Sequence, residues 1–462
     1  MAHKKGLALL FISSTLLAQQ KELTSFEDFY TNATAYLHEK KFEQAETYFT
    51  KALELNPHDL QTQFFLAASL HQQDKKVQAC NLYKAIIARY PSCTPVIYNL
   101  AHALKELGNM EESAHNYTIV IQREPTNTSA HLGLAQCYLA LGNFEQGWPH
   151  FEHRGPDIQQ FKNNIETLKN LVDSKKTLAN KRILLRTEWG IGDAIQFIQF
   201  AQKLKNKGAI IIMQARKELK SLFSLCPYID EVVGVGEAFP AHDLQIPLLS
   251  LPYIVQLSIR SVENQQPYFY ADEALVTAWK KKFNNNATFK IGLCWQGNGS
   301  PDSPPSLQKN IPLKELAPLA KLPTLSLYSL QQIKGLEELE SLPETFELNL
   351  FDESFDKVNG RFMDTAAVMK NLDLVVTIDT SIAHLAGALG VPVWLLLPYR
   401  TDWRWYLSQT IDDTEYSLWY PTMRLFRQPK PGDWKSVIED VISNLKQCLA
   451  MKSSAQKRIK HD

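Results

Sequence analysis

One residue pattern recurs every 34 positions between residues 26 and 154. Prolines keep this spacing at Pro57, Pro91 and Pro125. Four further positions of the unit show the same 34-residue spacing. Two of them hold small residues, namely Ala33, Ala67, Ala101 and Ala135 at one and Ala45 and Ala79 at the other. The other two hold bulky residues, namely Tyr36, Leu70, Leu104 and Tyr138 at one and Phe49, Tyr83, Tyr117 and Phe151 at the other. A small residue lets two helices approach closely, and a ring fills the space to the next unit. The pattern predicts stacked helical hairpins, three of them complete and a fourth shortened.

A 34-residue helix–turn–helix unit of this kind resembles the tetratricopeptide repeat. Such units stack into an α-solenoid whose concave face can hold a peptide or a protein. A structural spacer or a dimerisation arm is the alternative. We expect Trp148 and Phe151 to cover the hydrophobic end of the array, and residues 155–180 to form a polar linker.

Composition excludes several classes of partner and site. The 49 Lys and Arg residues balance 49 Asp and Glu residues, so no net charge favours nucleic acid or an anionic membrane. The six cysteines form no CxxC pair, which argues against a structural zinc and for a reducing, cytoplasmic setting. Within the N-terminal segment 1–25, the apolar run 6–18 is either a weak signal peptide or a first helix that packs on the repeats. No other stretch approaches a membrane span.

From residue 181 onward, short apolar strands alternate with helices, which predicts parallel sheets. A first α/β domain, residues 181–283, has strands near 183–185, 210–213 and 232–235 and a helix at 272–283. A second domain, residues 284–449, has strands near 291–295, 325–330, 374–378 and 391–397 and ends in a helix at 434–449. We expect residues 450–462 to be a disordered tail. Two such domains hold a ligand in the crevice between their strand ends.

The stretch 379–394 is the clearest candidate for a binding site. Asp379, Thr380 and Ser381 follow a buried strand and supply N-cap residues for a helix of small residues at 382–389. The backbone N–H groups of Thr380, Ser381 and Ile382, together with the helix dipole, would bind a phosphate. An ordinary capped helix is the alternative.

A second candidate is the turn after the first strand of the α/β region. Gly190 and Gly192 invite comparison with a dinucleotide fingerprint, but Ile195 stands where a third glycine is needed. The turn instead exposes backbone and directs Asp193 toward the crevice. Asp193 can serve there as a helix cap or as a catalytic group.

Several stretches of the chain together resemble the heptosyltransferases of glycosyltransferase family 9. They occur in the family's order between residues 186 and 434: RTEWGIGDAIQFIQFA (186–201), IPLLSLPY (246–253), IGLCWQGN (291–298), KNIPL (309–313), YSLQ (328–331), the segment 362–398, DWRW (402–405) and WYPTMRLFRQ (419–428). The resemblance implies a GT-B fold, in which two Rossmann-like domains face a crevice. It also implies inverting, metal-independent transfer from a nucleotide-diphosphate sugar held mainly by the second domain.

The resemblance also implies roles for individual residues. Asp193 corresponds to the proposed general base, Lys309 and His384 to positions at the donor phosphates, and Gln331 to the nucleoside site. His384 is alternatively a buried core histidine, and Asp379 is expected to support the turn. Trp403, Trp405 and Trp419 are expected in the core or the crevice wall. No two aspartates lie two positions apart, so the positive charge for a departing diphosphate is expected from Lys309 and the helix start, with no metal or other cofactor.

One departure from the family bears on the acceptor. Heptosyltransferases lack an N-terminal repeat array, whereas the combination is similar to protein O-linked glucosaminyltransferases. A protein or peptide acceptor held by the repeats is therefore one hypothesis. The alternative function is a non-catalytic interaction scaffold with a degenerate transferase domain.

Overall fold

The computed structural model describes residues 24–174, 177–262, 267–283, 289–297, 306–332, 334–343 and 345–459. Nearly all of the N-terminal apolar segment, and with it the predicted choice between signal peptide and helix, lies outside these residues. The chain divides between Pro91 and Ser92 into two compact units. Within the described ranges, no helix combines the length and apolarity that a membrane crossing requires.

The first unit contains two helical hairpins, in which each predicted small residue lies at a helix contact. Its helices are α1 (Phe26–His38), α2 (Phe42–Leu55), α3 (Leu60–Gln72) and α4 (Lys76–Arg89). Ala33, Ala45, Ala67 and Ala79 are fully buried. Side-chain caps begin the first helix of each hairpin, as where Asp59 accepts a hydrogen bond of 2.8 Å from the Thr62 N–H.

The second unit begins with two more hairpins and continues into the α/β region. The helices are α5 (Thr94–Glu106), α6 (Met110–Arg123), α7 (Thr128–Ala140) and the short α8 (Phe144–Phe151). Trp148 at the end of the array packs edge-on against Phe197 and Trp403, and Phe144 stacks on Trp419 at 5.7 Å. The hydrophobic end of the repeats is therefore covered by both α/β domains and shares a core with them.

The predicted linker is ordered where the structure describes it. It forms a 3-10 helix, η1 (Pro156–Phe161), and the helix α9 (Lys162–Asp173). Asn164 donates a hydrogen bond to the Gln245 carbonyl, and Glu166 accepts one from the Tyr253 hydroxyl. The segment thus packs against the first α/β domain.

The first α/β domain contains a four-stranded parallel sheet in the order β3-β2-β1-β4. The strands are β1 (Arg182–Arg186), β2 (Ile210–Ala215), β3 (Glu231–Gly234) and β4 (Leu244–Pro247). Its main helices are α10 (Ile191–Phe197), α11 (Ala201–Lys205), α12 (Lys220–Ser224) and α13 (Leu251–Ile254). Sequence patterning missed β4, because four residues that end in proline carry little strand signal.

The second α/β domain contains a seven-stranded sheet in the order β6-β5-β7-β8-β11-β10-β9. The parallel strands are β5 (Phe289–Cys294), β6 (Leu325–Ser329), β7 (Leu374–Ile378), β8 (Val393–Leu397) and β11 (Met423–Arg427), and the antiparallel edge consists of β10 (Thr414–Ser417) and β9 (Ser408–Ile411). Its α-helices are α15 (Leu313–Leu316), α16 (Met363–Met369), α17 (Ser381–Ala388) and α18 (Trp434–Ile459). The helix α18 continues about ten residues beyond its predicted end, into the segment expected to be a disordered tail.

The helix α14 (Glu273–Lys282), predicted within the first domain, packs on the second. The indole N–H of Trp279 donates a hydrogen bond of 2.8 Å to the Asp364 carboxylate in the first turn of α16. The preceding segment already lies against the second domain, since the Tyr268 N–H donates to the Ala388 carbonyl. The chain therefore crosses between the domains before α14.

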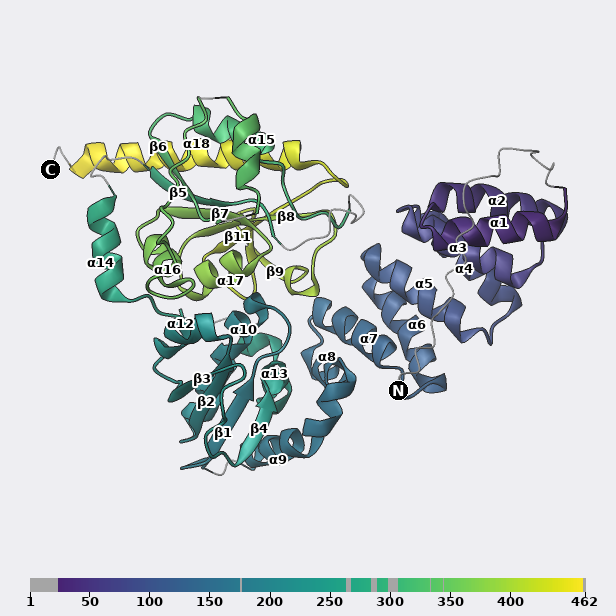
Figure 1. The fold of residues 1–462 in the computed structure, drawn as a ribbon, viewed down its shortest axis with the longest axis horizontal. Helices are drawn as coiled ribbons and strands as arrows, with labels where there is room; N and C mark the ends of the chain where they lie inside the picture. The colour runs from purple at the N-terminus through teal and green to yellow at the C-terminus, as the bar shows by residue number, and fades with distance from the viewer. Residues whose placement is uncertain are drawn as a thin grey trace, which may run out of the picture. The chain divides into compact units, whose positions relative to one another are not determined.

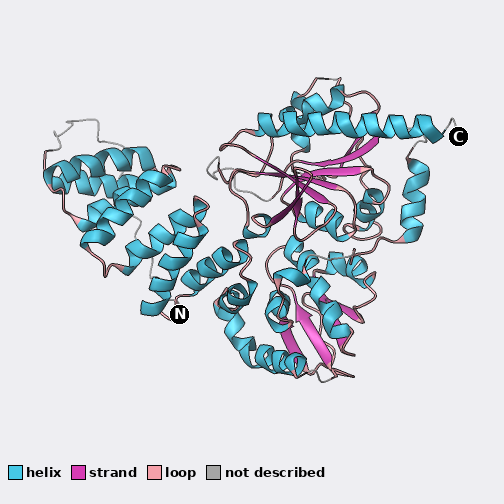
Figure 2. Cartoon of the chain, turned by 180° about the vertical axis from the view of Figure 1, so that it is seen from behind, coloured by secondary structure: helices cyan, strands magenta, loops and turns pink. Residues whose placement is uncertain are grey.

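The two α/β domains meet where α10 and α17 begin, at the ends of β1 and β7 (Figure 1). Strands occur only in these two domains among the described residues, whereas the repeats are helical throughout (Figure 2). A Cβ atom at Gly192 would lie 2.7 Å from Cδ2 of His384, so only glycine permits this approach of the two helices. The predicted fold class, helical hairpins followed by α/β domains with parallel sheets, is confirmed.

Candidate functional site

A cavity of about 460 Å³ opens between the two α/β domains, and we call it the interdomain cavity. Its lining residues are Gly190, Ile191, Gly192, Asp193, Arg216, Cys294, Gln296, Gly297, Lys309, Leu330, Gln331, Arg361, Phe362, Asp379, Thr380, Ser381, Ile382, His384, Asp402 and Arg404. Every residue of the predicted site is among them. The structure therefore brings together segments that are separated by more than two hundred positions in the sequence.

The start of α17 supplies backbone donors to the cavity. Thr380 is extended (φ −143°, ψ 176°), and its hydroxyl accepts a hydrogen bond of 3.3 Å from the Ile382 N–H. The N–H groups of a first helical turn have no carbonyl partner within the helix. The positive end of the helix dipole also points out of this turn. These features suit an anion, and Gly390 (φ +71°) ends the helix as predicted.

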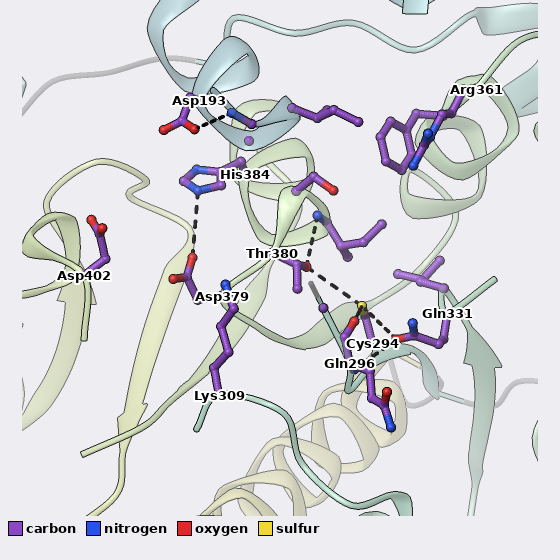
Figure 3. Close-up of a pocket in the computed structure, with 18 of the residues that line it drawn as sticks. Asp193, Cys294, Gln296, Lys309, Gln331, Arg361, Asp379, Thr380, His384 and Asp402 are labelled. Atoms are coloured by element: carbon purple, nitrogen blue, oxygen red, sulfur yellow. Dashed lines mark hydrogen bonds and ion pairs between the residues drawn. The ribbon is translucent and has the colours of Figure 1, made fainter. Parts of the chain in front are cut away.

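Cationic side chains from both domains surround this helix start. The side chain of Lys309 points toward Asp379 at the entry to α17 (Figure 3). Arg216 directly follows β2, and Arg361 lies in the loop before α16. Sequence analysis missed both arginines, although the position of Arg216 at a strand end was a usable signal.

Asp193 uses both carboxylate oxygens. Its Oδ2 atom accepts a hydrogen bond of 2.9 Å from the Gly190 N–H, so the residue does cap α10 (Figure 3). Its Oδ1 atom lies 2.5 Å from Nη2 of Arg404 in the second domain. Arg404 was not predicted as a site residue, because it stands between Trp403 and Trp405, which were expected to be core residues. The catalytic role assigned to Asp193 stays a prediction.

His384 lines the interdomain cavity but is otherwise buried, with only 6% of its surface exposed. Its Nδ1 atom lies 2.8 Å from the Tyr420 hydroxyl, and Nε2 lies 4.0 Å from Oδ1 of Asp379. Burial, assisted by the nearby charge of Arg404, lowers the pKa of His384 to about 4. The imidazole is therefore neutral at pH 7 and can offer a phosphate at most one hydrogen bond.

Asp379 directly follows β7, and burial has the largest effect on the pKa of its carboxyl. Burial raises the pKa of the Asp379 carboxyl, and the positive charge of Lys309 opposes this effect. A carboxylate here would repel a phosphate unless Lys309 lies between them. This arrangement agrees with the predicted supporting role for Asp379, which stays untested.

Gln331 lines the cavity, but its amide group is already engaged. Its Oε1 atom accepts hydrogen bonds from the N–H groups of Trp295 and Gln296, at 3.3 and 3.0 Å. Its Nε2 atom donates to the Lys334 carbonyl at 2.6 Å. The side chain thus holds the end of β5 in place, and its nucleoside-binding role stays a prediction.

The three tryptophans lie in the core next to the interdomain cavity, and none of them is among its lining residues. Trp403, Trp405 and Trp419 are all buried. The ring of Trp405 lies 5.4 Å from that of His384, and the indole N–H of Trp419 donates to the Arg404 carbonyl. They therefore shape the surroundings of His384 and Arg404.

A smaller cavity of about 190 Å³ lies between the third and fourth repeats and the loop after β8, and we call it the side cavity. Lys105 on α5 donates a hydrogen bond of 2.6 Å to Gln136 on α7 at its wall. Burial lowers the pKa of Lys105. Asp402 lines both cavities, so the side cavity and the interdomain cavity share this residue in their walls.

Comparison with known proteins identifies the repeats. Two tetratricopeptide repeat family models match the chain, at residues 29–59 and 98–147. A solved structure of MamA (AMB-1) is 21% identical and covers 28% of this chain and 71% of its own, with a TM-score of 0.27. The predicted tetratricopeptide repeats are confirmed.

Two other similarities cover more than half of the chain. The structure of E. coli ADP-heptose LPS heptosyltransferase II is 14% identical and covers 58% of this chain and 99% of its own, with a TM-score of 0.41. Protein FlbA of Caulobacter vibrioides is 21% identical over 299 residues, which is 58% of this chain and 47% of FlbA. The chain thus spans about half the length of this curated relative. The chain therefore contains tetratricopeptide repeats, and 58% of it is similar to a heptosyltransferase structure.

Proposed function

We propose that this protein is a glycosyltransferase that moves a sugar from a nucleotide-diphosphate sugar to an acceptor. One observation carries the proposal: the interdomain cavity combines the start of α17, Lys309 and the Asp193 carboxylate. The first two suit a diphosphate leaving group, and the third suits the proton of an attacking hydroxyl. The similarity of several sequence motifs to heptosyltransferases agrees with this chemistry.

The leaving diphosphate accumulates negative charge as the sugar–oxygen bond breaks. Fixed donors stabilise such charge without having to reorganise during the reaction. The N–H groups of Thr380, Ser381 and Ile382 and the ammonium of Lys309 would supply this stabilisation. Arg216 and Arg361 line the same cavity and add positive charge. We therefore propose that no metal ion takes part.

The acceptor hydroxyl becomes nucleophilic as its proton leaves. Asp193 would take that proton while the hydroxyl oxygen attacks the anomeric carbon from the face opposite the diphosphate. Such an attack inverts the configuration at the anomeric carbon. Gly190 and Gly192 would support this role, because the turn they form carries Asp193 into the cavity.

We further propose that the acceptor is a protein or peptide presented by the repeats. The side cavity supports this proposal, since repeat helices α5 and α7 form one wall and its lining residue Asp402 also lines the interdomain cavity. The balanced charge of the chain gives no support to a nucleic-acid acceptor. The six cysteines form no CxxC pair, which agrees with a cytoplasmic enzyme; this location stays part of the proposal.

The direct test is to incubate the purified full chain, in EDTA, with UDP-, GDP- and ADP-sugars and to measure the released nucleoside diphosphate. We expect hydrolysis or transfer with one of the three nucleotides, and stabilisation against heat by that nucleotide. If no donor releases a nucleoside diphosphate and none stabilises the chain against heat, the scaffold alternative is favoured. Release that requires added Mg²⁺ would overturn the proposed metal-free mechanism.

A further inference from the structure

Arg404 connects the two walls of the interdomain cavity. Its guanidinium group donates to Oδ1 of Asp193 at 2.5 Å and to Oε1 of Gln196 at 2.6 Å. Both acceptors belong to α10 in the first domain, where they stand three positions apart and so face the same side of the helix. A third bond, of 2.8 Å, joins Arg404 to Asp402 in its own domain.

The surroundings of Arg404 restrict its movement. The residue is 6% exposed, and its guanidinium carbon lies 4.5 Å from the ring centre of Trp403 and 5.6 Å from that of Phe197. Burial alone would lower the pKa of Arg404, but Asp402 and Asp193 outweigh this effect and raise it. The charge is therefore fixed in place, and each of its donor edges has a partner.

We propose that Arg404 is a positioning residue for Asp193, and that it sets the Asp193 carboxylate for catalysis only while the two domains are closed on each other. This inference rests on the proposed function. The Gly190 N–H holds one carboxylate oxygen from within the first domain, and Arg404 holds the other from the second. When the domains separate, Asp193 loses the second contact and its side chain can turn away from the acceptor.

The arrangement has a consequence for the order of events. Lys309 and the start of α17, which would hold the donor diphosphate, both belong to the second domain. The donor can therefore bind to this domain before Arg404 contacts Asp193 of the first domain. Domain closure would then bring Arg404 onto Asp193 after the donor is in place. Loss of Arg404 should therefore lower kcat and leave donor affinity nearly unchanged.

The test compares Arg404→Gln and Arg404→Lys with the control Arg424→Gln. Arg424 donates to Asn444 and packs over Trp394 and Phe426, and it does not line the interdomain cavity. We expect Arg404→Gln to lower kcat for nucleotide-sugar turnover about 100-fold and to change donor KM less than threefold. Arg404→Lys should retain more of the wild-type kcat than Arg404→Gln. In a further variant, Arg404→Ala, guanidinium added to the assay should restore part of the lost kcat. The control should retain kcat.

A second measurement does not depend on turnover. Hydrogen exchange of the Gly190 amide reports whether Asp193 still accepts its hydrogen bond. If Arg404 positions Asp193, exchange at Gly190 should become faster in Arg404→Gln and remain unchanged in Arg424→Gln. If the wild-type chain turns over no donor, the proposed function fails, and this exchange measurement still decides whether Arg404 positions Asp193.

Three results would overturn the inference. A raised donor KM with unchanged kcat would make Arg404 a donor ligand. Equal losses in Arg404→Gln and Arg424→Gln, with no recovery in Arg404→Lys or from guanidinium, would make its role purely structural. Unchanged exchange at Gly190 in Arg404→Gln would show that Asp193 is held without it.

Discussion

The two helices that begin at the interdomain cavity, α10 and α17, differ in how they use their first turn. In α10 the Asp193 carboxylate bonds back to the Gly190 N–H, so this helix satisfies one of its own donors. In α17 the Thr380 hydroxyl accepts a longer hydrogen bond, of 3.3 Å, from the Ile382 N–H and lies 3.9 Å from Sγ of Cys294, and the helix start lines the cavity. The first domain thus contributes a carboxylate and the second contributes donors. This division suits a reaction with a proton acceptor on one side and a leaving anion on the other.

The largest effect on activity is expected from Asp193→Asn. The amide oxygen of asparagine can still accept a hydrogen bond from Gly190, so the substitution removes the charge while α10 keeps its cap. We expect kcat to fall about 1000-fold, because a positioned base contributes roughly 10²–10⁴-fold. Donor affinity, measured by calorimetric titration, should stay within threefold. A variant as active as the wild type would remove Asp193 from the mechanism.

Lys309→Met tests the other side of the cavity. Loss of a charge-assisted contact to phosphate costs about 1.5–3 kcal/mol, so the donor Kd should rise roughly 10- to 100-fold. Lys314→Met is the matched control, because Lys314 is exposed on α15 and does not line the cavity. Equal donor affinity in the two variants, measured by titration, would show that Lys309 does not hold the diphosphate.

The pH dependence of stability offers a third test, because His384 lies on α17 and is buried. The folded-state pKa of His384, about 4, lies below the ordinary value of about 6.5, so the unfolded chain binds the proton more tightly. Stability should therefore fall as the pH drops from about 6.5 toward 4, with a contribution from His384 of roughly 2 kcal/mol at pH 5. Urea unfolding at pH 7 and pH 5 should show a smaller difference in His384→Gln than in the wild type. An equal difference would contradict the neutral, buried state of His384.

The smallest effect is expected where the two helices touch. The new Cβ atom of Gly192→Ala would meet the His384 ring at 2.7 Å, so the domains must shift apart slightly. Overpacking of this kind costs about 1–2 kcal/mol, which thermal unfolding can detect. Gly155→Ala is the control, since its Cβ would meet no atom within 4 Å. Equal unfolding temperatures for the two variants would mean that α10 and α17 are not in close contact.

The same contrast shows what sequence patterning can predict. The repeats and the central strands β7 and β8 were predictable because their signals are local: a fixed period in one case and runs of buried β-branched and apolar residues in the other. The start of α17 was predictable for the same reason, since strand, cap and helix are contiguous. Each of these features needs only neighbouring residues.

The features that were missed depend on contacts between distant segments. Arg404 and Asp193 are more than two hundred positions apart, and no local pattern connects them. Arg216 and Arg361 reach the cavity only because the two domains face each other. The packing of α14 on the second domain depends on the bond between Trp279 and Asp364. Such pairings follow from the tertiary fold, which a periodic pattern does not specify.

The central claim is that α17 and Lys309 hold a diphosphate in the interdomain cavity without a metal ion. A crystal structure of the full chain, grown in the presence of Mg²⁺ with the nucleoside diphosphate that stabilises it, tests this claim most directly. We predict phosphate oxygens within hydrogen-bond distance of the Ser381 and Ile382 N–H groups and of the Lys309 ammonium. Phosphates bound elsewhere, or bridged to the protein by Mg²⁺, would contradict the account.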